Sequence, residues 1–167
     1  MLLAVVSVVA AGLTYAADVS KPAARTEVFF DHPEKFTDVK DDVMASDSGR
    51  DSILASLSQF LVRETADRLP AGDKLSITFT DIDLAGEFEP WRGPQWDGVR
   101  IYKDIYPPAF KFSYAVTDAS GKVVKSGTES IRDVDYQMRG AVLSNDPLRY
   151  EKSILEDWAR LALRDLK

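Results

Sequence analysis

The alternation of apolar and polar positions divides this chain into strands and two amphipathic helices. The clearest strand pattern covers 75–84, where apolar residues first alternate with hydroxyl side chains, as expected for a half-buried strand. The apolar phase then shifts by one residue, to Ile82 and Leu84. A regular strand would turn these two side chains to the opposite face, so the shift predicts a β-bulge near 80–82.

The same reasoning predicts further strands on both sides of this one. A second alternating segment covers 110–117, and the polar stretch at 118–121 predicts a hairpin turn in which a glycine adopts the left-handed conformation. The returning strand is then expected at 122–131. Short apolar segments at 27–30 and 99–102 indicate two more strands.

Two segments show the three- and four-residue spacing of amphipathic helices. The first is expected to begin at a Ser48 or Asp51 cap and to end before Pro70. The second is expected to begin with Asp146 as N-cap and Pro147 at its first position. The stripe predicted to be buried on the second helix consists of Tyr150, Ile154, Leu155, Trp158, Leu161 and Ala162.

The order strand, helix, several strands, helix predicts an α+β fold. Each helix is apolar on one side only, and so are the alternating strands. The economical packing is a two-layer sandwich, with two helices on one face of a mixed, mostly antiparallel sheet of four to five strands. The opposite face is expected to be solvated or used for binding. It would carry Lys111, Ser113, Thr117 and part of Ser76, Thr78 and Thr80.

The start of the chain differs from the rest, because residues 1–17 carry no charged side chain. The apolar run 2–13 has the length of a signal-peptide core, although no basic residue precedes it. We expect a cleaved signal peptide, with the cut after Ala16 or Ala17. The alternative is an uncleaved anchor, which is disfavoured because a spanning helix needs about 20 apolar residues. Residues 18–167 then form a single domain.

Composition narrows the classes of function. The net charge of −6 argues against binding to nucleic acid or to anionic membrane surfaces. The chain has no cysteine, which excludes a lipidated cysteine, a thiolate metal site and a cysteine nucleophile. Its one histidine, His32, excludes any zinc site that needs two imidazoles. We interpret His32 as a loop residue, with a functional histidine as the alternative.

Asp81 and Asp83 form the first candidate site. Two carboxylates two residues apart on a strand point the same way, about 7 Å apart, which suits an oxygen-ligated metal or an acid/base pair. The alternative is structural. Acidic residues at the end of a strand also cap turns or pair with basic side chains, such as Arg100, Lys103 or Lys111.

The second candidate is the loop 85–98, called here the tryptophan loop, which contains Trp91, Arg92 and Trp96. Tryptophan and arginine are enriched at binding hot spots and stack on ligands. The alternative is that the two tryptophans fold back as a lid over the sheet edge. Tyr106, followed by two prolines, is a further candidate contact. The proline pair instead favours an extended bend between strands.

Several segments resemble a known family. They are TDIDLAGEFEPWRG at 80–93, VRIYKDIYPP at 99–108 and DPLRYEKSILEDW at 146–158, and VFFDHPEKFTDV at 28–39 resembles the family's opening strand and turn. These segments are similar to the exported bacterial domain-of-unknown-function family number 3016. The resemblance implies a Gram-negative source and a periplasmic or secreted single domain. The resemblance assigns no catalytic residue to this chain.

The leading hypothesis is a non-enzymatic binding or interaction module of the bacterial envelope. The tryptophan loop and Tyr106 would contact a partner protein or a small ligand. We expect no cofactor, no nucleic acid, no stable membrane insertion after cleavage, and a monomer. The alternative is a metal-dependent or acid/base hydrolase centred on Asp81 and Asp83, assisted by His32 or Glu87. A structural envelope protein without any ligand is the third possibility.

Overall fold

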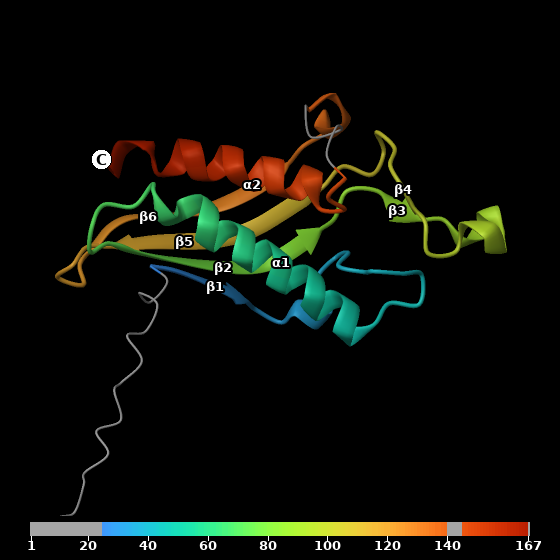
Figure 1. The fold of residues 1–167 in the computed structure, drawn as a ribbon, viewed down its shortest axis with the longest axis horizontal. Helices are drawn as coiled ribbons and strands as arrows, with labels where there is room; N and C mark the ends of the chain where they lie inside the picture. The colour runs from blue at the N-terminus through green and yellow to red at the C-terminus, as the bar shows by residue number, and fades with distance from the viewer. Residues whose placement is uncertain (1–24, 140–144, 167) are drawn as a thin grey trace, which may run out of the picture.

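The computed structural model describes residues 25–139 and 145–166 (Figure 1). The expected signal peptide, 1–17, lies outside the described residues. Within them the chain forms a four-stranded sheet, a two-stranded ribbon and two α-helices. The main elements are β1 (Thr26–Phe30), α1 (Asp47–Ala66), β2 (Lys74–Asp83), β3 (Glu87–Phe88), β4 (Arg100–Ile101), β5 (Ala109–Thr117), β6 (Val123–Arg132) and α2 (Arg149–Ala162).

The predicted α+β two-layer sandwich is confirmed. The strand order in the sheet is β1-β2-β5-β6. β1 pairs with β2 in parallel and the other pairs are antiparallel, so the sheet is mixed. Both helices pack on the same face of this sheet (Figure 1). The predicted strand at 99–102 is present as β4, but it pairs with β3 in the separate ribbon.

The predicted β-bulge is also confirmed. The register between β2 and β5 shifts between Phe79 and Asp81, which leaves Thr80 as the extra residue. Ile82 therefore returns to the buried face of the sheet. Asp81 pairs in register with the exposed Lys111, so the two aspartates of β2 lie on the open face.

Aromatic side chains fill the core between the sheet and the helices. Phe79 contacts Phe110 and Phe112 at ring-centroid distances of 6.1 and 4.9 Å. Trp158 of α2 packs edge-on against Phe112, with the ring centroids 4.9 Å apart. Edge-to-face pairs of this kind add to the stabilisation from apolar burial. The core therefore holds α2 across β5.

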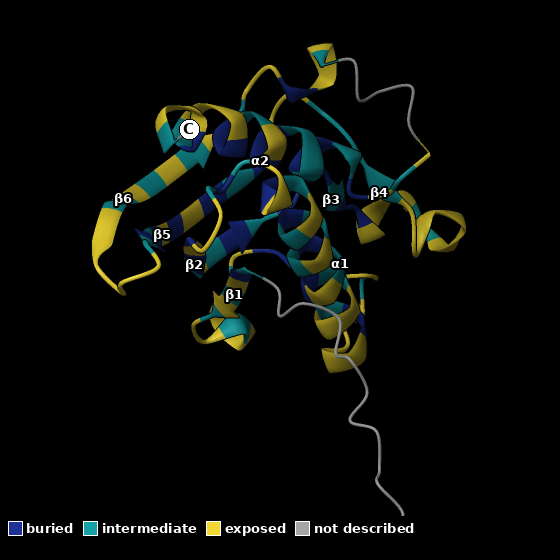
Figure 2. Ribbon diagram, turned by 60° about the vertical axis from the view of Figure 1, so that its left-hand side comes forward, coloured by how far each residue is buried: buried dark blue, intermediate teal, exposed yellow. Residues whose placement is uncertain are grey.

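The hairpin between β5 and β6 forms as predicted. Gly121 has a φ of +86° and donates its N–H to the carbonyl of Asp118. β6 forms one edge of the sheet, and its residues are exposed or half-buried along its whole length (Figure 2). Edge strands present unpaired backbone groups on their outer side.

Helix α1 begins earlier than either predicted cap. It begins at Asp47, and the side chain of Ser46 accepts the N–H of Gly49 at 2.9 Å. The prediction of Ser48 or Asp51 as cap was wrong because the polar run offers several equivalent residues. A Cβ at Gly49 would lie 1.9 Å from the carboxyl carbon of Asp41, so the Asp41 side chain would have to move to admit one. The helix ends at Ala66, before Pro70, as predicted.

Helix α2 begins two residues later than predicted. Asp146 accepts the N–H of Leu148 at 2.8 Å in a turn ahead of the helix, and Arg149 is the first helical residue. The predicted stripe is buried except at its end, where Leu161 is 52% exposed. Leu161 borders a groove between α2 and β6 that no described side chain fills. Of the helices in the described part of the chain, none is long and apolar enough to cross a bilayer.

Candidate functional site

The tryptophan loop projects from the end of the molecule that carries the β3–β4 ribbon (Figure 1). Two short 3-10 turns, Pro90–Arg92 and Pro94–Trp96, place its aromatic residues. Trp91 is 71% exposed and Trp96 is 37% exposed. The alternative that both tryptophans fold back as a lid is therefore wrong for Trp91.

The loop is anchored by Glu89, whose side chain is only 1% exposed. Its carboxylate accepts hydrogen bonds from Lys103 and Arg92 and from the hydroxyl of Tyr106, the last at 2.8 Å. The hydrogen bond from Lys103, helped by those from Arg92 and Tyr106, outweighs desolvation and lowers the pKa of Glu89 to about 2. Arg92 and Tyr106 thus hold the loop in place, and the guanidinium of Arg92 also lies 5.5 Å from the ring centre of Trp96.

Asp81 and Asp83 lie apart from this loop, on β2. Asp81 accepts the backbone N–H of Thr37 at 2.9 Å and pairs with Lys111 at 3.0 Å. Burial alone would raise the pKa of Asp81, but these hydrogen bonds lower it. For Asp83, burial and the nearby carboxylate of Asp38 raise the pKa. The structural alternative, pairing with a basic side chain, describes Asp81.

The acidic neighbours of Asp83 are Asp38, Asp81 and Glu87. In the described part of the chain, no three acidic, histidine or cysteine side chains come together as a metal would require. His32 is exposed in a left-handed turn and lies 3.2 Å from Glu34. It occupies the loop position expected from the sequence.

A pocket of about 390 Å³ lies where the two helices meet the β3–β4 ribbon. The six site residues predicted from the sequence, Trp91, Arg92, Trp96, Tyr106, Asp81 and Asp83, all lie outside its lining. Apolar side chains and the aliphatic parts of polar ones make up most of the wall. The lining residues are Lys40, Asp41, Ser52, Ile53, Ser56, Leu84, Phe88, Gly98, Arg100, Tyr102, Pro147, Leu148 and Glu151.

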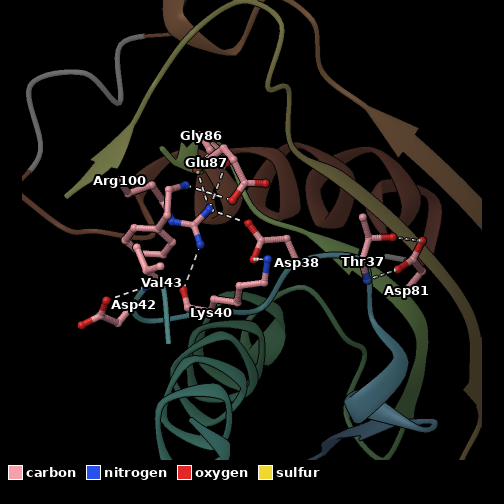
Figure 3. A network of polar contacts seen from close by, with 11 residues as sticks. Thr37, Asp38, Lys40, Asp42, Val43, Asp81, Gly86, Glu87 and Arg100 are labelled. Carbon is pink, nitrogen blue, oxygen red and sulfur yellow. Dashed lines mark hydrogen bonds and ion pairs between the residues drawn. The ribbon is translucent and has the colours of Figure 1, made fainter. Parts of the chain in front are cut away.

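Arg100 of β4 holds one wall of this pocket (Figure 3). Its Nη1 donates to Asp38 Oδ2 at 2.7 Å and to the carbonyl of Gly86 at 2.9 Å, and its Nη2 donates to the carbonyl of Lys40 at 2.9 Å. The guanidinium also stacks on the ring of Phe88, 4.6 Å from its centre. Arg100 therefore ties the segment before α1 to the ribbon, and these donors are already used within the protein.

Glu151 of α2 forms the other distinctive wall. Its side chain is 1% exposed, and Oε1 accepts the backbone N–H of Ala85 at 2.7 Å. Oε2 is buried and has no hydrogen-bond partner among the described residues. Burial raises the pKa of Glu151, and neither the hydrogen bond from Ala85 nor the charges of Arg100 and Arg149 offset this. A residue of the pocket wall thus carries a buried carboxyl oxygen without a partner among the described residues.

Sequence reasoning missed Glu151, although a signal was present. Glu151 precedes Ile154, Leu155 and Trp158 by three, four and seven residues, which places it on the buried stripe of the helix. A carboxylate on an apolar stripe must find a partner or change its pKa. Arg100 gave no comparable local signal, because its partners lie about sixty residues away in sequence.

Comparison with known proteins gives a family but no activity. The sequence profile of a family described as protein of unknown function (DUF3016) matches residues 24–161. No match was found among curated proteins or solved structures. The matched segment includes every strand of the sheet, the tryptophan loop and the pocket, and it confirms the resemblance seen in the sequence. The chain therefore belongs to the DUF3016 family of proteins of unknown function.

Proposed function

We propose that this protein is a non-enzymatic binding module of the bacterial envelope, which holds a small amphipathic ligand in the pocket beside Glu151. One observation carries the proposal: Glu151 lines the pocket, and its Oε2 atom is buried without a hydrogen-bond partner among the described residues. A volume of about 390 Å³ lies in the range of small-molecule pockets. Such pockets combine apolar walls with a few fixed polar groups.

A purely structural role explains Glu151 poorly. Leaving a buried acceptor unpaired costs about 1–3 kcal/mol, and a leucine at the same position would avoid that cost. A ligand that brings a hydrogen bond to Oε2 would recover it. The apolar side chains of Ile53, Leu84 and Phe88 line the same pocket and would contact the body of the ligand.

The lining also favours binding over catalysis. Its hydroxyl groups belong to Ser52, Ser56 and Tyr102, and the single histidine of the chain is not among the lining residues. A serine nucleophile needs an adjacent base. Arg100 already donates to protein oxygens, so its guanidinium serves to position the wall.

Octanol is a suitable probe, because it has an apolar tail and one hydroxyl group. Amide NMR of the isotope-labelled protein is expected to show octanol shifting resonances around Ala85 and Leu148. Ser56→Phe should fill the pocket and abolish these shifts. Gln59→Phe, on the exposed side of α1, is the matched control and should leave them intact. Absence of binding, or equal binding by both variants, would contradict the proposal.

The location of the protein in the envelope is part of the proposal. The uncharged, apolar stretch 1–17 and the resemblance to exported proteins support it. Expression of the full chain in a Gram-negative host, followed by osmotic shock, should release a shortened protein. N-terminal sequencing is expected to read from Ala17 or Asp18. Recovery of the uncut chain in the cytoplasm would contradict this part.

The tryptophan loop offers a second function, contact with a partner protein. The observation that favours it is the exposure of Trp91 on a loop anchored by Glu89. The loop also adjoins the pocket at both ends, because Ala85 binds Glu151 and Gly98 lines the wall. In a periplasmic pull-down, the wild-type protein should capture one specific partner that the Trp91→Ala variant does not capture. Identical captures would exclude this contact.

A further inference from the structure

We infer that β6 is a dimerisation edge, at which a second copy of this chain pairs antiparallel with the first, with Gly127 opposite Gly127. The result would be one continuous eight-stranded sheet across a two-fold axis. The inference does not depend on the ligand pocket. It replaces the monomer expected from the sequence.

The first observation is the free backbone of β6. The strand is ten residues long, Val123–Arg132, and pairs with β5 on one side only. Among the described residues, no other strand pairs with its outer side. The opposite edge of the sheet, β1, has only five residues. A long free edge is a template for another strand.

The second observation is the order of charges along β6. Lys125 and Glu129 lie two residues on either side of Gly127. In an antiparallel pair centred on Gly127, Lys125 of each copy therefore stands opposite Glu129 of the other. Both side chains line the groove between α2 and β6, so they lie on the helix side of the sheet. Opposite charges at directly paired positions stabilise an antiparallel pair.

The third observation is the complementarity of the other face. The same register places Ser126 opposite Thr128, twice, and both residues are exposed on the open face. Hydroxyl pairs across strands form hydrogen bonds. At the centre, a Cβ on Gly127 would lie 2.8 Å from the Tyr114 ring. The absence of a side chain at 127 lets Tyr114 cover the strand beside the two-fold axis.

Edge strands often carry a lysine that prevents pairing. Lys125 does not prevent pairing here, because the register places it opposite Glu129 of the second copy. The two charges therefore attract each other. Exposed apolar residues at the start of the strand, Val123 and Val124, also favour burial in an interface.

Sedimentation velocity on the purified protein over a wide concentration range tests the inference. Wild-type protein should show a reversible monomer–dimer equilibrium. Lys125→Glu and Glu129→Lys, each alone, place like charges opposite one another and should weaken the dimer about tenfold or more. The double variant with both changes restores the opposite pairs and should recover the wild-type dissociation constant.

Lys35→Glu, in the exposed turn after β1 at the opposite edge of the sheet, is the matched charge control and should leave the equilibrium unchanged. Circular dichroism establishes that every variant is folded, and the double variant keeps the composition of the wild type. A wild-type protein that stays monomeric at all concentrations would overturn the inference. So would a dimer that is insensitive to the single charge changes, because it would form elsewhere.

Discussion

Glu89 and Glu151 are equally buried, at 1% exposure each, yet their environments shift the pKa in opposite directions. Glu89 accepts hydrogen bonds from Lys103, Arg92 and Tyr106, and its pKa falls to about 2. Glu151 accepts one backbone N–H, and burial raises its pKa. Hydrogen-bond donors outweigh desolvation at Glu89, whereas desolvation is the largest cause of the shift at Glu151.

The difference also separates two uses of a buried acid. Glu89 is saturated by its neighbours, so it can anchor the tryptophan loop but offers nothing to a ligand. Glu151 retains a free oxygen beside a pocket, so it can bind something that the chain itself does not supply. The tryptophan loop, which stands out in the sequence, surrounds Glu89. Glu151, with its unpaired oxygen, lies instead on α2.

Arg100→Leu is expected to have the largest effect on stability. It removes the guanidinium from Asp38, which is nearly buried, and breaking a buried ion pair costs about 3–5 kcal/mol. It also removes a positive charge that lowers the pKa of Glu151. The pKa of Glu151 should therefore rise further, away from that of Glu89. Urea denaturation measures the first effect. A loss below about 1 kcal/mol would mean that solvent reaches Asp38 freely.

Glu89→Gln should destabilise the protein at neutral pH but not in strong acid. The wild-type pKa is lowered from 4.5 to about 2, so the ionised carboxylate contributes stability above pH 4.5. That contribution is lost as the pH falls from 4.5 towards 2. The difference in unfolding free energy between wild type and variant, measured across this range, should shrink accordingly. A difference that does not change with pH would contradict the assigned hydrogen bonds.

Glu151→Gln is expected to stabilise the ligand-free protein by about 1 kcal/mol at neutral pH, because it removes a desolvated charge. The folded-state pKa is raised above 4.5, so the wild type loses stability as the pH rises beyond that value. Wild type and variant should therefore agree below pH 4.5 and diverge above it. Glu156→Gln, on the exposed side of the same helix, is the control and should show no divergence.

Trp91→Ala should have the smallest effect, a change in stability within about 0.5 kcal/mol. The side chain is 71% exposed, so its removal leaves no cavity. Thermal unfolding of the variant measures the change. An unfolded or insoluble variant would show that Trp91 belongs to the core, and the tryptophan loop would lose its interest as a contact surface.

The fold followed from the sequence wherever one local pattern dominated. The phase shift after Phe79 predicted the bulge, and one-sided helices predicted the two layers. The start of α2 was misplaced, because Asp146 and Pro147 are equally suited to a turn one step ahead of a helix. The pocket was not predicted, since Arg100 and Asp38 meet only in the folded chain. Glu151 could have been identified from the sequence, because it lies on the apolar stripe of its helix.

The bulge at Thr80 decides which residues of β2 face the core. Residues before it and after it face the core in opposite phases of the two-residue strand repeat. If Thr80 took a regular strand position instead of forming the bulge, Ile82 would turn towards solvent and Asp81 and Asp83 would face the aromatic core. Deleting Thr80 would remove the extra residue and leave a regular strand, with Ile82 still buried and Asp81 still opposite Lys111. Replacing Thr80, which is exposed, should also be tolerated. One exposed residue thus lets a strand whose apolar residues follow two phases bury both sets.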